Sequence, residues 1–119
     1  MTAAIYNFEI NQGTTFKKNI FWKNADTNEA MNLTGYTARM QARRSYTDDT
    51  VLFDLTSTNG LIQLTPTLGK IVITIPATQT STFTDWTRAK YSLRVTSPDG
   101  TVTRLLEGDI TLAKDIIRD

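Results

Sequence analysis

Residues 36–43 read Tyr-Thr-Ala-Arg-Met-Gln-Ala-Arg, and this stretch is the clearest guide to the fold. Aromatic or apolar side chains occupy every second position, and polar or charged side chains occupy the positions between them. A period of two is the signature of a β-strand, because successive side chains point to opposite faces of the sheet. The stretch therefore predicts a strand with one buried face and one face in water.

The same alternation recurs along the chain, most clearly at residues 70–75 and 90–97. Asn59-Gly60 and Pro98-Asp99-Gly100 fall between apolar runs and predict tight turns. About eight or nine short strands, with turns at intervals of roughly 8–12 residues, are typical of a sandwich or barrel. We therefore predict an all-β fold: a single-domain antiparallel β-sandwich with an immunoglobulin-like layout. The further strands are expected at residues 6–10, 16–22, 51–56, 61–64, 102–106 and 109–112.

Residues 76–86 lack this alternation. The segment begins with a proline and is rich in threonine, which has a poor helix propensity. We expect a crossing loop with one helical or 3₁₀ turn. Phe83 and Trp86 are expected to plug one end of the core, although Trp86 is an equally good candidate for a partner contact, because tryptophan is enriched at binding hot spots. The same two alternatives apply to Trp22, for which we favour the core.

Composition excludes several classes of function. The chain has 119 residues, which fits one domain, residues 1–119. It has no histidine and no cysteine, so the usual nucleophile–base pairs are absent. Asp48-Asp49 is interpreted as part of a loop, because a calcium site needs more oxygen ligands at set spacing. The sequence thus predicts no enzyme, no metal site and no cofactor.

Charge and hydropathy suggest neither a membrane nor a nucleic acid as partner. Lys and Arg number 13 and Asp and Glu number 12, so the formal net charge is +1. Such a balance gives no long-range field to steer nucleic acid or an anionic membrane. No apolar run approaches the roughly 20 residues that span a bilayer, and the N-terminus does not resemble a signal peptide. We expect synthesis and folding in a cytoplasm.

Three groups of residues are candidates for contact with a partner. Arg39, Arg43 and Arg44 form a small basic group, interpreted either as a solvated face paired with carboxylates or as a protein–protein contact, in preference to a nucleic-acid patch. The second group is the loop around Phe83, and the third is the C-terminal tail, whose isoleucines either extend the last strand or dock on a neighbouring subunit. The full set of candidate contacts is Arg39, Arg43, Arg44, Phe83, Trp86, Ile116 and Ile117.

A series of landmarks follows in a characteristic order. Gly13-Thr-Thr-Phe16 leads into Ile20-Phe-Trp-Lys23, and Asn32 to Arg43 follows a polar loop. Later landmarks are Asn59-Gly-Leu-Ile62, Gly69 to Ile75, Tyr91 to Val95 and Ser97 to Gly108. This layout resembles small structural proteins of tailed bacteriophages and is similar to the N-terminal sandwich domain of phage baseplate upper proteins.

The resemblance implies a virion component made in the host cytoplasm, with no catalysis and no cofactor. Its partners would be other virion proteins in the tail, baseplate or fibre-attachment region, and it would join a symmetric homo- or hetero-oligomer. Two alternatives remain open. One is a capsid decoration or cement protein, and the other is a carbohydrate-binding module that touches the host surface. A sugar platform would have to use Trp22, Tyr46 and Trp86.

Overall fold

The alternating stretch forms strand β4 (Thr37–Arg43) in the interior of the larger of two sheets, where both neighbouring strands pair with it antiparallel. The computed structural model describes residues 4–24, 26–114 and 116, which form nine strands and two short helical turns. The larger sheet has the order β1-β9-β8-β4-β5, and β2 also pairs with β9. Its other strands are β1 (Ala4–Ile5), β2 (Phe8–Asn11), β5 (Phe53–Thr56), β8 (Arg88–Thr96) and β9 (Val102–Ala113).

The smaller sheet is antiparallel, with the order β3-β7-β6. Its strands are β3 (Phe16–Phe21), β6 (Ile62–Thr65) and β7 (Lys70–Ile75). A 3₁₀ turn, η1 (Pro66–Leu68), joins β6 to β7, and a single helical turn, α1 (Ala77–Thr80), follows β7. Neither turn in the described part of the chain is long and apolar enough to cross a bilayer. The prediction of a mostly β protein is confirmed.

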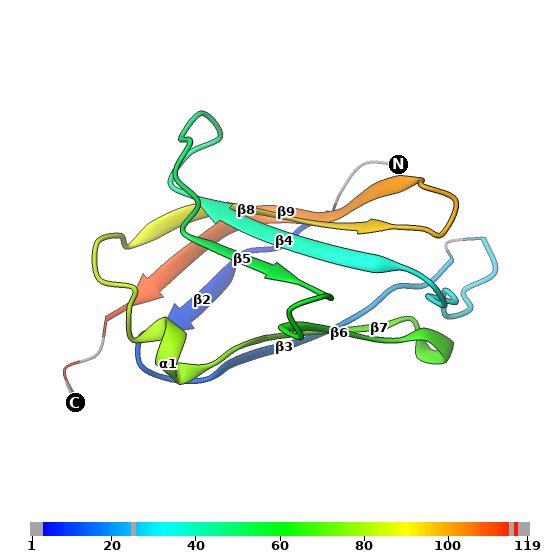
Figure 1. Ribbon diagram of the computed structural model, residues 1–119, viewed down its shortest axis with the longest axis horizontal. Coiled ribbons are helices and arrows are strands. Elements are labelled where there is room, and N and C mark those ends of the chain that lie inside the picture. Colours follow the sequence, from blue (N-terminus) through cyan, green and yellow to red (C-terminus); the bar gives the residue numbers. More distant parts are fainter. Residues whose placement is uncertain (1–3, 25, 115, 117–119) are drawn as a thin grey trace.

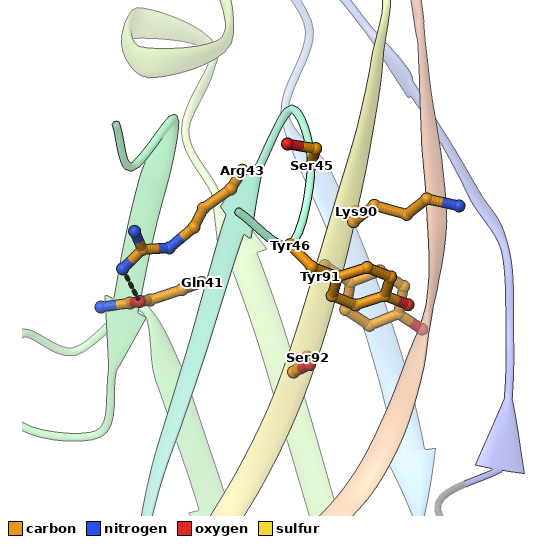
Figure 2. Close-up of a pocket in the computed structure, with 7 residues that line it drawn as sticks. All are labelled: Gln41, Arg43, Ser45, Tyr46, Lys90, Tyr91 and Ser92. Atoms are coloured by element: carbon orange, nitrogen blue, oxygen red, sulfur yellow. Dashed lines mark hydrogen bonds between the residues drawn. The ribbon is translucent and has the colours of Figure 1, made fainter. Parts of the chain in front are cut away.

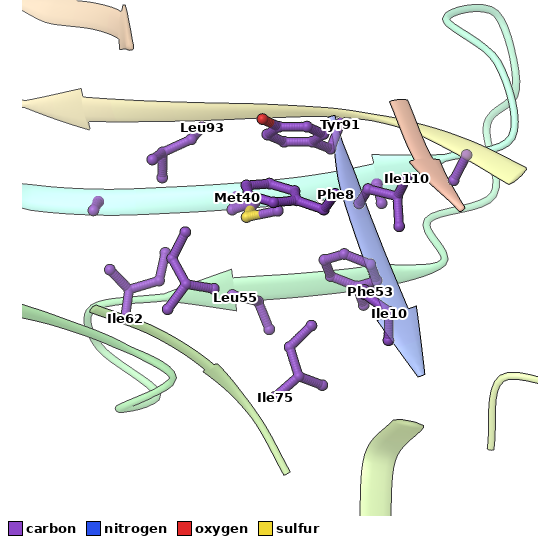
Figure 3. Packing of buried hydrophobic residues seen from close by; sticks show 14 of the residues in the cluster. Phe8, Ile10, Met40, Phe53, Leu55, Ile62, Ile75, Tyr91, Leu93 and Ile110 are labelled. Carbon is purple, nitrogen blue, oxygen red and sulfur yellow. The ribbon is translucent and has the colours of Figure 1, made fainter. Parts of the chain in front are cut away.

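The two sheets lie as two layers, one above the other (Figure 1), and the inward side chains of both build one core. Met40 and Leu93 of the larger sheet and Ile73 of the smaller sheet have no exposed surface. Burying a side chain of this size contributes about 1.5–3 kcal/mol. Figure 3 shows side chains from both layers meeting between the sheets, among them Met40, Leu55, Ile62 and Ile75. The predicted alternation in β4 and β7 therefore identifies the core-facing side chains correctly.

The prediction of a wholly antiparallel fold is wrong in one respect. β1 and β2 pair with β9 in parallel, so the larger sheet is mixed. β2 continues through a short turn into β3, which is an edge strand of the smaller sheet. Side-chain alternation reports which face of a strand is buried, but it does not report the direction of its neighbour.

β9 is one strand of 12 residues where the sequence predicted two. A register shift lies in its pairing with β8: Leu93 is opposite Leu106 and Arg94 is opposite Arg104, which leaves Leu105 as the extra residue of a β-bulge. Gly108, further along β9, is approached closely by the chain between β1 and β2. A Cβ atom on Gly108 would lie 2.5 Å from the carbonyl oxygen of Tyr6, so only glycine fits there without a shift of backbone.

Residues 76–86 contain the single helical turn that their sequence suggested. The hydroxyl of Thr80 donates to the carbonyl of Thr14 over 2.7 Å and ties α1 to the turn between β2 and β3. Phe83 and Trp86 are 4% and 5% exposed, and the Phe83 ring lies 5.7 Å from Phe53 and 5.3 Å from Trp86. Both rings thus belong to the core, and the alternative that they offer surface to a partner is corrected by their burial.

Candidate interaction surfaces

The outer face of the larger sheet is polar, and the strand register arranges its side chains in rows across the strands. In one row, Gln41 of β4 lies opposite Ser92 of β8, which lies opposite Glu107 of β9. In the adjacent row, three arginines take the equivalent places: Arg39 is opposite Arg94, and Arg94 is opposite Arg104. We call Arg39, Arg94 and Arg104 the arginine row. The row, together with Gln41 and Ser92, lines an open hollow of about 290 Å³.

The two outer arginines of the row are paired with carboxylates. Arg39 donates to both oxygens of Asp54 on β5, over 3.1 and 2.7 Å. This hydrogen-bonded contact holds the pKa of Asp54 below its ordinary value, in spite of partial burial, which acts in the opposite direction. Arg104 lies 3.3 Å from a carboxylate oxygen of Glu107. The side chain of Arg94, between them, makes no hydrogen bond or ion pair within the part of the chain that the structure describes.

A second hollow, of about 180 Å³, adjoins the row on the same face and is shown in Figure 2. Arg43 donates to the side-chain oxygen of Gln41 and, over 2.9 Å, to the carbonyl of Asp48 in the loop after β4. Lys90 points the other way, toward β9, where its ammonium lies 2.5 Å from Asp109. That hydrogen bond raises the pKa of Lys90. The polar groups of this hollow are therefore largely engaged with one another.

The structure separates the three arginines that the sequence grouped together. Arg39 and Arg43 share the outer face of β4, whereas Arg44 lies in the following loop and pairs with Asp85 over 2.8 Å. Arg39 and Arg44 therefore pair with carboxylates within the chain, whereas Arg43 donates to a backbone carbonyl and to the side chain of Gln41. Sequence reasoning missed Arg94 and Arg104. Both occupy expected strands, but neither their register nor the bulge that turns Arg104 outward is visible in the sequence.

An apolar groove lies where β3, at the edge of the smaller sheet, meets β1 and β9 of the larger sheet. We call it the edge groove, and its volume is about 250 Å³. Phe21 is 58% exposed on the outward side of β3, and Trp22 next to it is half-buried, with its ring edge-on to Tyr36 at 6.1 Å. The groove is lined by Ala4, Ile20, Phe21, Trp22, Lys23, Leu105 and Leu106. Leu105 and Leu106 are the two residues at the bulge of β9.

The remaining candidates are dispersed. Ile116 is 92% exposed beyond the last strand, and Ile117 lies outside the described residues. Tyr46 is exposed in the loop after β4, and its ring centre lies 6.0 Å from the Lys90 ammonium. Because Trp86 is buried, the sugar platform of Trp22, Tyr46 and Trp86 does not form in this structure.

No protein-family model matches the chain, and comparison with curated proteins finds no similar sequence. Among the described residues, no three carboxylates come together in a way that would hold a metal ion. The edge groove and the arginine row are the two surfaces of the described residues on which aromatic or like-charged side chains gather around a hollow.

Proposed function

We propose that this chain is a non-enzymatic structural protein that makes protein–protein contacts in a phage virion, in the tail, baseplate or fibre-attachment region. The order of sequence landmarks supports the class of protein. The edge groove is the observation that supports a protein–protein contact. We include in the proposal the immunoglobulin-like layout of the sandwich and membership of a symmetric oligomer, in which a self-complementary or head-to-tail contact closes the assembly.

The edge groove has the composition of the centre of a protein interface. Interface centres are apolar and rich in aromatic side chains, and charged groups lie at their rims. Here Phe21 and Trp22 stand beside Leu105 and Leu106, and Lys23 lies at the margin. A partner that covered Phe21 would remove a large aromatic surface from water, at about 25 cal/mol for each Å² of apolar area.

The contact is proposed to use the side chains of the groove and not backbone pairing along β3. Lys17 points outward from this edge strand, and Lys18 sits on its core-facing side. The Lys18 ammonium lies 2.5 Å from the Tyr6 hydroxyl. Lysines on an edge strand, above all inward-pointing ones, oppose pairing with a further strand. A side-chain contact leaves these lysines in water.

The test combines localisation with one matched pair of variants. We expect the chain to be found in purified phage particles by mass spectrometry, and cryo-electron microscopy to place it at a symmetric contact in the tail that buries Phe21. In solution, Phe21→Ser should weaken assembly about tenfold or more, because it removes the exposed aromatic anchor. Tyr46→Ser is the control, since it removes an even more exposed ring outside the groove.

Two outcomes would contradict the proposal. One is a chain that stays monomeric and does not associate with particles. The other is equal weakening of assembly by Phe21→Ser and Tyr46→Ser, which would show that the edge groove is not part of the contact. Density on the capsid shell in place of the tail would favour the decoration protein.

A further inference from the structure

We propose that the arginine row is a second interaction surface, independent of the edge groove, and that it binds carboxylate side chains of a protein partner. The row sets three positive charges at directly opposed positions on β4, β8 and β9. Neighbouring strands lie about 4.8 Å apart, and like charges at opposed positions destabilise a sheet. A local arrangement that works against the stability of the isolated chain, on an exposed face, points to a role in binding.

The β-bulge is the feature that completes the row. Glu107 lies on the outer face opposite Ser92, so strict alternation from Glu107 would turn Leu105 outward and Arg104 toward the core. The extra residue at Leu105 reverses this pattern, so that Leu105 is buried and Arg104 stands opposite Arg94. Bulges commonly re-aim a side chain in this way. One irregularity therefore moves a leucine inward and brings a third arginine to the row.

The chain's own carboxylates leave one position open. Asp54 occupies the outer side of Arg39, and Glu107 lies beside Arg104, whereas Arg94 between them is exposed and unpaired among the described residues. The contact between Arg39 and Asp54 shows which ligand suits this face: both carboxylate oxygens accept from one guanidinium. Bidentate contacts of this kind are the strong, directional ones. A partner's Asp or Glu placed over Arg94 would repeat the same contact at the centre of the row.

The surrounding charges favour separate carboxylates over a continuous polyphosphate. Asp54, Glu107 and Asp109 are interleaved with the basic groups of this face, and they would repel a nucleic-acid backbone laid along it. The whole chain has a net charge of +1, which provides little long-range attraction for nucleic acid. An acidic protein segment can instead place single carboxylates between the chain's own.

In the experiment, a capped hexaglutamate peptide is titrated into the whole chain. Binding is monitored by the NMR signals of backbone amides and arginine Nε–H groups. Saturable shifts are expected at the arginine row. Arg94→Gln should weaken binding about tenfold, the loss expected for one charge-assisted bidentate contact. Arg88→Gln is the matched control, because Arg88 is exposed on the same face of the same strand. Asp54→Asn should tighten binding, since it frees Arg39 from its carboxylate.

Thermal unfolding separates lost binding from lost folding. The Tm of Arg94→Gln should not fall below that of the wild-type chain, because Arg94 has no partner to lose and its removal relieves repulsion. Equal weakening by Arg94→Gln and Arg88→Gln would overturn the proposal, as would the absence of saturable shifts. A dodecathymidine oligonucleotide that binds more tightly than hexaglutamate, and whose binding is lost in Arg94→Gln, would overturn the proposal and favour a nucleic-acid partner. Phe21→Ser should leave the hexaglutamate titration unchanged, so this test does not depend on the edge groove.

Discussion

The hydroxyl of Tyr91 on β8 donates a hydrogen bond to the backbone carbonyl of Tyr6 over 2.5 Å, and so links residues 85 positions apart in the sequence. Tyr6 lies between β1 and β2, where the N-terminal chain passes Gly108 of β9. Tyr91 is almost fully buried, and this burial raises the pKa of its phenol, which stays protonated and remains a donor. The contact holds the N-terminal segment in place beside β9 and β8 of the larger sheet.

Tyr91→Phe removes this donor and keeps the ring. We expect a loss of about 1 kcal/mol in the free energy of unfolding, the usual net value of one buried hydrogen bond. Urea denaturation at pH 7 provides the measurement. Tyr46→Phe is the control, because Tyr46 is exposed and its hydroxyl should contribute little. A Tyr91→Phe variant as stable as the wild-type chain would show that the link to Tyr6 contributes nothing.

Gly108→Ala tests the close approach of the N-terminal chain. The new methyl group would lie 2.5 Å from the carbonyl oxygen of Tyr6 and 2.8 Å from the side-chain oxygen of Asn7, so part of the backbone must move. We expect a cost of about 2 kcal/mol or more, as for other overpacked sites. Gly100→Ala is the comparison: Gly100 has a φ of 91° but no atom close to an added Cβ, so its cost should be about 1 kcal/mol. The reverse order of the two losses would contradict the crowding argument.

Phe83→Ala tests whether the segment after α1 is part of the core. Phe83 is buried between Phe53 and Trp86, and truncation of such a ring costs about 3–5 kcal/mol. Chemical denaturation followed by Trp fluorescence should show this loss. Truncation of the exposed Tyr46 should change stability by less than about 0.5 kcal/mol. A small effect of Phe83→Ala would show that this ring contributes little to the packing of the core.

The ion pair between Arg39 and Asp54 predicts a dependence of stability on pH. The folded-state pKa of Asp54 is lowered, so the stabilisation is fully present above its unfolded pKa, about 3.9, and is lost as the pH falls through the folded value. Because both side chains are partly exposed, Asp54→Asn should cost only about 0.5 kcal/mol at pH 7. At pH values below the folded-state pKa of Asp54, the two proteins should converge in stability. A difference that grows on acidification would contradict the predicted sign.

The strands and the core were largely predictable from the sequence. β7 has the predicted bounds, Lys70–Ile75, and its three isoleucines all face the core. The loop with one helical turn also appears where the proline and the threonines suggested it. Such features are local, because the period of alternation and the turn residues act on neighbouring positions of the chain.

The candidate surfaces were predictable only in part. Arg39 was recognised as a candidate contact because it alternates with apolar residues in a clear strand. Arg94 and Arg104 became candidates only once the strand register placed them in one row with Arg39. The edge groove likewise combines residues 4, 20–23 and 105–106, which lie in three separate strands or at their ends. Contacts between such distant segments depend on which strand edges meet, and alternation within one strand does not encode that choice.

The sequence by itself determined that this protein is built from short strands around an apolar core, because burial of every second side chain is a local property of a strand. Tertiary structure alone decided that β1 and β2 run parallel to β9 and that a bulge turns Arg104 outward. Each of these outcomes depends on how two distant segments share hydrogen bonds or space. Such contacts between distant segments are set only when the two sheets pack together.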